Sequence, residues 1–160
     1  MIAVNEVRVC MNEAGARRQP FLFGVDFELS EGFFVLDPLG QQEILFEVGG
    51  VSNSPMREGI SGVLSEKMFS MNPMAYEVYQ EKFAVVREGV ARGDSFLLNL
   101  TVATGLDTNW TLEEIFHRAQ SPYRLLVPGR FVCFSPEIFV RMDEGMISSY
   151  PMKGTIDASV

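Results

Sequence analysis

A lysine enclosed by proline and glycine is the residue of this sequence best suited to nucleophilic chemistry. Lys153 lies in the segment Pro-Met-Lys-Gly-Thr at residues 151–155, directly after a strand-like run. Proline fixes the backbone and glycine lets another group approach closely, so this lysine would be held on a stiff bend. Desolvation there lowers the pKa of an amine, and the neutral amine is the nucleophile. Taken alone, the segment fits a solvated turn lysine better.

A carboxylate at the end of an apolar run is the second candidate. Glu137 lies in Ser-Pro-Glu-Ile-Phe at residues 135–139. Because Pro136 cannot donate to a β-ladder, the backbone should bend or leave the sheet there and could project the carboxylate into a cleft. A carboxylate so placed can act as a general acid or base. On these residues alone, a solvated strand-end glutamate is the simpler interpretation.

The other chemistry-bearing residues have ordinary structural explanations. No phosphate-binding glycine loop, zinc-ligand spacing or nucleophile elbow occurs. The single histidine, His117, is interpreted as a surface or boundary residue of a short amphipathic helix. Cys10 and Cys133 share no metal-type spacing, and Cys133 is expected to be a buried small hydrophobe, with a disulfide not favoured.

Length and composition indicate one cytoplasmic globular domain. The 160 residues are 47% hydrophobic, enough for a sizeable core, and no apolar run reaches the ~20 residues of a membrane helix. Polar residues near the N-terminus exclude a secretory signal. The net charge of -8 argues against nonspecific nucleic-acid binding, although a locally basic pocket could still take a small anion.

The elements that must position these residues are mostly strands. Strands are expected at residues 21–28, 33–36, 44–48, 95–104, 123–127, 130–134 and 147–150, with turns at 37–40, 128–129 and 143–145. Residues 56–71 fit no single element. The sequence therefore predicts an α+β fold with a mainly antiparallel sheet, one long helix and one short helix.

The long helix should begin with Asn72 as its cap and Pro73 at its first helical position, and should end at Gly93. One apolar stripe runs along it, formed by Tyr76, Tyr79, Phe83, Val86 and Val90. The short helix should follow a capping box at residues 111–114. Its apolar face would be Leu112, Ile115, Phe116 and Ala119.

Taken together, the two candidate sites resemble the chorismate-utilising enzymes. Ser-Pro-Glu-x-Phe followed by Pro-x-Lys-Gly-Thr is similar to that family's paired motifs. Residues 93–101, Gly-Asp-Ser-Phe-Leu-Leu-Asn-Leu-Thr, resemble a third motif, and the three occur in family order. The resemblance is firm over residues 76–160 and weaker over residues 21–48. It implies the first part of an anthranilate-synthase-type α/β sandwich.

Lys153 indicates the branch of the family. Anthranilate and isochorismate synthases typically carry a small residue there, whereas the aminodeoxychorismate (para-aminobenzoate) synthase branch carries lysine. The resemblance implies that Lys153 adds to C2 of chorismate as the C4 hydroxyl leaves, with Glu137 as the acid–base group. Ammonia then enters at C4 to give 4-amino-4-deoxychorismate, a folate precursor. The implied substrate-binding positions are Ser135, Asn99, Gly154 and Thr155.

In that family, the magnesium-binding glutamates and much of the sheet lie in the second half of the catalytic domain. The resemblance therefore implies that residues 1–160 are one truncated chorismate-binding domain, with the Mg²⁺ ligands elsewhere and negligible turnover by this chain alone. It also implies a glutamine amidotransferase partner that supplies ammonia. An incomplete sheet would expose an edge and favour self-association.

Two other functions stay open at this point. One is anthranilate synthase or another chorismate enzyme. The other is a non-catalytic domain that binds an amino acid, because related family members bind tryptophan in their N-terminal sheets. Neither Trp110 nor the phenylalanine-rich strands decide between these possibilities.

Overall fold

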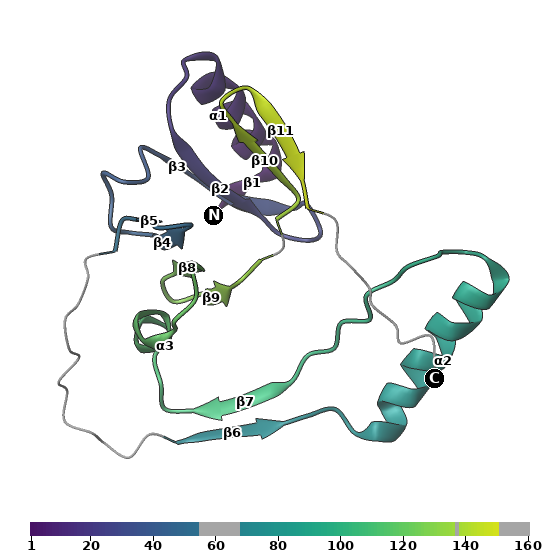
Figure 1. Cartoon of the computed structure of the whole chain (residues 1–160). Helices are drawn as coiled ribbons and strands as arrows, with labels where there is room; N and C mark the ends of the chain where they lie inside the picture. Colours follow the sequence, from purple (N-terminus) through teal and green to yellow (C-terminus); the bar gives the residue numbers. More distant parts are fainter. Residues whose placement is uncertain (55–67, 137, 151–160) are drawn as a thin grey trace. The chain divides into compact units, whose positions relative to one another are not determined.

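The computed structural model describes residues 1–54, 68–136 and 138–150. The chain divides into two compact units, one formed by Met1–Gly59 with Leu112–Val160 and the other by Ile60–Thr111. The described residues form mostly antiparallel strands, with a few helices between runs of them (Figure 1). The predicted α+β class with antiparallel sheets is therefore confirmed. No helix among these residues has the length and apolar character needed to cross a membrane.

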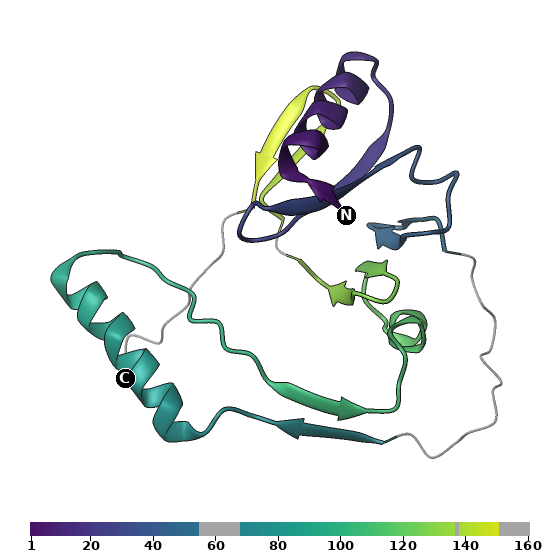
Figure 2. The same cartoon turned by 180° about the vertical axis from the view of Figure 1, so that it is seen from behind.

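The first unit begins with a helix on a three-stranded sheet. Its elements are β1 (Ile2–Ala3), α1 (Val4–Ala16), β2 (Phe21–Val25) and β3 (Glu31–Leu36). The strand order is β1-β3-β2, and α1 packs against β2 and β3 (Figure 2). The helix buries Val7 and Ala14. It is held at its start by Glu6, whose carboxylate accepts the Ala3 N–H at 3.2 Å.

Helix α1 is absent from the sequence expectations, which contained only one long and one short helix. Its start carries none of the usual polar caps, because Ala3 occupies the N-cap position and makes no side-chain hydrogen bond. Its end has Arg17 at the C-cap in place of a glycine. Val7, Cys10 and Ala14 keep helical spacing, but Val9 adds an exposed apolar side chain off that face. The helix is defined by packing on the sheet rather than by local signals.

The β2–β3 hairpin is closed by a polar turn and two glycines. Asp26 accepts the Ser30 and Glu31 N–H groups at 2.7 and 3.2 Å, and also the Ser30 hydroxyl. These bonds, the hydroxyl's above all, hold the pKa of Asp26 below its ordinary value. A side chain at Gly24 would collide with the Phe33 ring, which is buried against it.

Gly32 is a position where any side chain should destabilise the hairpin. An added Cβ would lie 2.4 Å from the backbone oxygen of Gly24 and 3.1 Å from Val7. We expect Gly32→Ala to lower the free energy of unfolding by about 1–3 kcal/mol, because backbone cannot move aside cheaply. Gly15→Ala is the matched control, since nothing lies within 4 Å of its added Cβ. The control should gain about 0.5 kcal/mol in urea unfolding, and equal losses in both variants would contradict the expectation.

A four-stranded sheet and a short helix complete the core of the first unit. The strand order is β5-β4-β8-β9, all antiparallel. The elements are β4 (Leu45–Val48), β5 (Val51–Ser52), α3 (Leu112–Arg118), β8 (Tyr123–Val127) and β9 (Phe131–Phe134). Phe116 from α3 is fully buried, as is Leu126 from β8, and α3 packs on β8 and β9. The predicted short helix and the strands at 44–48, 123–127 and 130–134 are confirmed.

The last described elements of this unit form a hairpin. β10 (Val140–Asp143) pairs with β11 (Met146–Ser149). The expected turn is confirmed, with Glu144 and Gly145 at φ 48° and 79°. β11 matches the strand expected at residues 147–150 to within one residue at each end, whereas β10 was not expected.

The second unit contains one strand pair and the long helix. β6 (Phe69–Asn72) pairs with β7 (Gly105–Thr108), and α2 spans Tyr76–Arg92. Gly93 ends the helix in a left-handed conformation at φ 86°, as expected. The expected cap at Asn72 is wrong, and so is the expected first helical position at Pro73. Asn72 pairs with Gly105, and a residue before proline is driven to extended backbone, so the helix starts only after Ala75.

The strand expected at residues 95–104 is also wrong. These residues are in no helix or strand, and the ladder begins only at Gly105. A strand forms only where a neighbouring strand exchanges backbone hydrogen bonds with it. Strand β6 exchanges its backbone hydrogen bonds with β7, not with residues 95–104. Phe96 is consequently almost entirely exposed. Residues 95–104 therefore have the composition of a strand, but no described strand pairs with them.

Candidate functional site

Most residues of the expected site fall outside the part of the chain that the structure describes. Glu137, Lys153, Gly154 and Thr155 belong to this group. Ser135 and Asn99 are described. Asn99 is exposed in the irregular segment before β7, and Ser135 follows β9 directly. The two lie in different compact units.

Ser135 marks a sharp break at the end of β9. Its backbone has φ 46°, in the left-handed region that a non-glycine residue adopts only when its surroundings hold it there. Its N–H donates to the Tyr123 carbonyl at 2.8 Å. Its hydroxyl oxygen lies 2.9 Å from that of Ser121, which itself donates to the Tyr123 carbonyl at 2.7 Å. The expected departure of the chain from the sheet before Pro136 is therefore confirmed.

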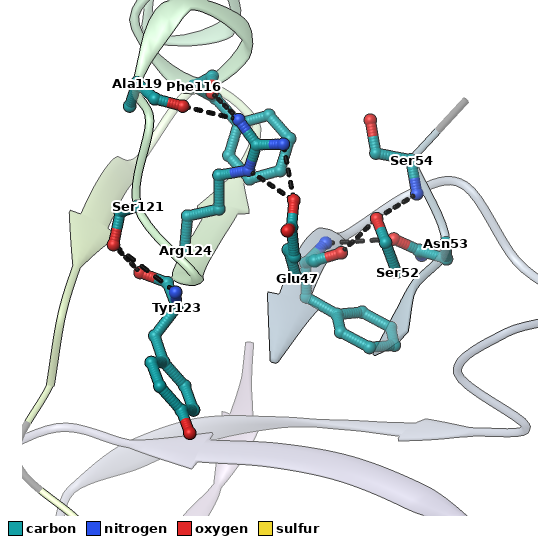
Figure 3. A network of polar contacts seen from close by, with 10 residues as sticks. Glu47, Ser52, Asn53, Ser54, Phe116, Ala119, Ser121, Tyr123 and Arg124 are labelled. Carbon is teal, nitrogen blue, oxygen red and sulfur yellow. Dashed lines mark hydrogen bonds and ion pairs between the residues drawn. The ribbon is translucent and has the colours of Figure 1, made fainter. Parts of the chain in front are cut away.

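Arg124 joins α3 to two strands and was not predicted as a key residue. On β8 it stands opposite Glu47 of β4, to which it donates two hydrogen bonds, from Nε at 3.0 Å and from Nη2 at 2.5 Å. Its Nη1 donates to the carbonyls of Phe116 and Ala119 at 3.1 and 2.7 Å (Figure 3). The guanidinium also lies 5.0 Å from the centre of the Phe116 ring.

These contacts give Arg124 three structural tasks. It satisfies carbonyls that the last turn of α3 leaves without intrahelical partners, where positive charge is favourable. It neutralises Glu47, and it covers one face of the Phe116 ring. The Glu47 side chain is 26% exposed and that of Arg124 is 20% exposed, so solvent screens the pair only partly. A single arginine inside the apolar run at 123–127 was the only sequence signal.

Removal of the Arg124 side chain should loosen α3 from its sheet. We expect Arg124→Ala to lower the free energy of unfolding by about 2–3 kcal/mol, because it leaves Glu47 and two carbonyls partly buried without their donor. Arg141→Ala is the control, since its pair with Asp143 is largely exposed and should contribute nothing measurable. Urea denaturation followed by circular dichroism compares the two. Equal midpoints would refute the assignment.

A hollow of about 390 Å³ in the first unit is lined by residues of β4, β5, β8 and β10 and by Ile138. Its walls are mainly apolar, with Tyr123 and Arg141 as the polar contributions; the lining residues are Val48, Gly49, Val51, Tyr123, Ile138, Val140 and Arg141. Arg141 donates to Asp143 at 2.9 Å, and this bond raises the pKa of the guanidinium. An apolar hollow with a permanent positive charge at its edge suits a small ring that carries carboxylates.

Other reactive groups lie where the structure gives them no role in a site. Cys10 and Cys133 are free and half-buried, and burial raises the pKa of the Cys133 thiol, which disfavours the reactive thiolate. His117 is half-buried in the last turn of α3, edge-on to the Phe116 ring. Within residues 1–54, 68–136 and 138–150, no three His, Cys, Asp or Glu side chains form a group that could hold a metal.

Comparison with known proteins establishes the family. The chorismate binding enzyme family matches residues 53–159, and the chain belongs to that family. It is 39% identical over 154 residues to an uncharacterised PabA-like protein of Pasteurella multocida (strain Pm70), covering 93% of this chain and 46% of the relative. It is 40% identical over 150 residues to an uncharacterised PabA-like protein of Haemophilus influenzae (strain ATCC 51907 / DSM 11121 / KW20 / Rd), covering 93% of this chain and 44% of the relative. No solved structure matches significantly.

The family predicted from the paired motifs is thereby confirmed. The matched residues include the Ser-Pro-Glu segment, the Pro-Met-Lys-Gly-Thr segment and residues 93–101. The chain spans less than half the length of the two relatives. The roles of the individual site residues remain predictions.

Proposed function

We propose that this chain is the front part of an aminodeoxychorismate synthase component I, which converts chorismate and ammonia into 4-amino-4-deoxychorismate. Membership of the chorismate binding enzyme family supports chorismate as the substrate. The particular reaction rests on one observation, the lysine at position 153 within the matched region. A primary amine at that place supplies a nucleophile that a small aliphatic residue could not.

The proposed reaction balances as a double substitution. The Lys153 amine forms a bond to C2 of chorismate, the ring double bond shifts, and the C4 hydroxyl leaves. Glu137 donates the proton that turns the departing hydroxyl into water. Ammonia then bonds to C4 and passes its extra proton to Glu137, the double bond returns, and the bond to Lys153 breaks. The net change is chorismate plus ammonia to 4-amino-4-deoxychorismate plus water.

The scaffold around Ser135 supports an acid–base role for the residue two positions later. The strained backbone of Ser135 is fixed by Tyr123 and Ser121, so the start of the Ser-Pro-Glu segment has one defined path out of β9. The hollow beside Ile138 offers apolar walls and the Arg141 charge. A rigid support of this kind is what positions a catalytic group precisely.

Two further parts of the proposal concern components outside this chain. Magnesium would neutralise substrate carboxylate charge, with its ligands in the part of the domain that this chain does not cover. Ammonia would come from a glutamine amidotransferase partner. A cytoplasmic location is also proposed, as for an enzyme that takes a soluble metabolite.

The test is amination of chorismate by a complete domain. A chimaera would join this chain to the part of the Haemophilus influenzae relative that it does not match, and would be incubated with chorismate, ammonium and Mg²⁺. We expect 4-amino-4-deoxychorismate as the product, detected by chromatography, and negligible turnover by the chain alone. The full-length relative, assayed in parallel, is the control. Anthranilate as the product would overturn the assignment in favour of the anthranilate branch.

One observation favours a second candidate, a domain that binds an amino acid. A hollow of about 580 Å³ in the first unit is lined by apolar residues, including Phe33, Leu125 and Phe131, and by the charged residues Asp26, Glu31 and Arg130. Arg130 donates to Glu31 at 3.1 Å. Opposite charges in a largely apolar hollow suit a zwitterion with an apolar side chain. A thermal-shift comparison of tryptophan with chorismate separates the two functions, since binding of the amino acid alone would favour regulation.

A further inference from the structure

A pair of serine hydroxyls lies where the chain leaves β9. Ser121 comes two residues before β8 and Ser135 directly follows β9, and their hydroxyl oxygens are 2.9 Å apart. The Tyr123 carbonyl accepts the Ser121 hydroxyl at 2.7 Å (Figure 3). The same carbonyl accepts the Ser135 N–H at 2.8 Å. Ser121 is half-buried and Ser135 is exposed, so a ligand can reach only the second hydroxyl freely.

Each hydroxyl hydrogen of this pair can be assigned. A serine hydroxyl has one hydrogen to donate and two lone pairs with which to accept. The Ser121 hydrogen is directed at the Tyr123 carbonyl, and the Ser121 oxygen also accepts the Tyr123 N–H at 3.3 Å. The hydrogen between the two hydroxyls therefore belongs to Ser135. The reverse arrangement would lose the Ser121 bond to the carbonyl without forming a new one.

The Ser135 hydroxyl consequently presents lone pairs to a ligand. Its single hydrogen is used within the pair, so its oxygen accepts a hydrogen bond and does not donate one. A carboxylate, which has only lone pairs to offer, is excluded as its partner. The backbone of Ser135 is held at φ 46° by the bond to Tyr123, which fixes the direction of the side chain as well. Strained residues that are held in this way are typical of binding sites.

We infer, on the basis of the proposed function, that Ser135 accepts a hydrogen bond from the C4 hydroxyl of chorismate and that Ser121 is the positioning residue that makes Ser135 an acceptor. Chorismate has two carboxylates, an ether oxygen and one hydroxyl. Because the carboxylates are ionised at neutral pH, the C4 hydroxyl is its only hydrogen-bond donor. Tyr123, which binds both serines, also lines the apolar hollow of about 390 Å³. The bond to Ser135 holds the leaving hydroxyl with its own lone pairs free to receive a proton.

The test compares two ligands on the chimaera of this chain with the unmatched part of the Haemophilus influenzae relative. One ligand is chorismate, and the other is its C4 methyl ether, which keeps the oxygen but has no hydrogen to donate. Calorimetric titration without ammonium, in the Lys153→Ala background, measures both dissociation constants without turnover. We expect Ser121→Ala to weaken chorismate binding at least about threefold and to leave binding of the ether unchanged. Ser121→Thr keeps the hydroxyl and should restore chorismate binding.

A second variant separates the acceptor from the backbone. Ser135→Gly removes the hydroxyl, and glycine adopts φ 46° without strain, so the path of the chain is kept. This variant should bind chorismate about fivefold more weakly. Adding Ser121→Ala to it should cause no further loss, because Ser121 acts only through the Ser135 hydroxyl. Ser70→Ala, at an exposed serine of β6 in the other compact unit, is the matched control and should bind both ligands normally.

Three outcomes would overturn the inference. Equal weakening of both ligands by Ser121→Ala would mean that Ser121 only supports the fold. Unchanged chorismate binding by Ser135→Gly would remove the acceptor, even if Ser121→Ala did not fold. Tighter chorismate binding by Ser121→Ala would place a carboxylate at Ser135. Because binding is measured without turnover, a chimaera that binds chorismate but makes no 4-amino-4-deoxychorismate contradicts the proposed reaction and leaves this result readable.

Discussion

Lys153→Ala in the complete catalytic domain is expected to reduce formation of 4-amino-4-deoxychorismate by at least about a thousandfold. In the proposed reaction this amine forms the bond to C2 that allows the C4 hydroxyl to leave, and removal of a nucleophile usually removes most of the catalysis. The measurement is steady-state product formation by the chimaera with saturating ammonium. The dissociation constant of chorismate, measured separately, should change far less than the rate.

Two substitutions in the same segment make this prediction specific. Lys153→Arg keeps the positive charge, but a guanidinium does not give up its proton, so this variant should be as inactive as Lys153→Ala. Met152→Ile exchanges apolar residues of similar volume next to the lysine and should keep the activity within a few fold. Activity in Lys153→Arg would indicate an electrostatic role. Undiminished amination at C4 by Lys153→Ala would remove the basis of the proposed function.

Phe116→Ala should be the most destabilising single substitution in the first unit. The Phe116 side chain is fully buried where α3 packs on the four-stranded sheet. The Arg124 guanidinium covers one face of its ring. Truncation of a buried phenylalanine leaves a cavity and costs about 3–5 kcal/mol. This is comparable to the total stability of a small unit, so a large fraction of the chain should be unfolded at 37 °C.

Thermal unfolding followed by far-UV circular dichroism measures this effect. Phe27→Ala is the control, because Phe27 is 97% exposed in the β2–β3 turn and its loss should change the melting temperature little. Phe116→Leu retains most of the volume and should fall between the two. A melting temperature of Phe116→Ala within two degrees or so of the control would show that α3 is not part of the core.

The fold class and the turns were readable from the sequence because their causes are local. Gly93 ends α2 and Gly145 turns the last hairpin, each with a positive φ that glycine adopts without strain. The strands at 123–127 and 131–134 follow from short apolar runs bounded by Pro128 and Gly129. The family was equally readable, since the motif residues lie close together in the chain.

The errors arose where a neighbour in space decides the outcome. Asn72 has the side chain of a helix cap, but pairing with Gly105 makes it the end of a strand. Residues 95–104 have β propensity and no partner strand among the described residues, so they form no ladder. Helix α1 lacks polar caps and exists because it packs on β2 and β3.

The sequence by itself determined the family, the fold class and the candidate nucleophile, because residue type and short spacing carry that information. Only the tertiary structure identified Arg124 as the residue that joins α3, β4 and β8, since Glu47 lies 77 positions away along the chain. Only the tertiary structure showed that no other described helix or strand packs on the stripe of α2, whereas Phe116 of α3 is fully buried. Both helices have amphipathic sequences. An amphipathic pattern indicates that one face of a helix is more stable when buried. The arrangement of the other helices and strands decides whether this chain buries that face.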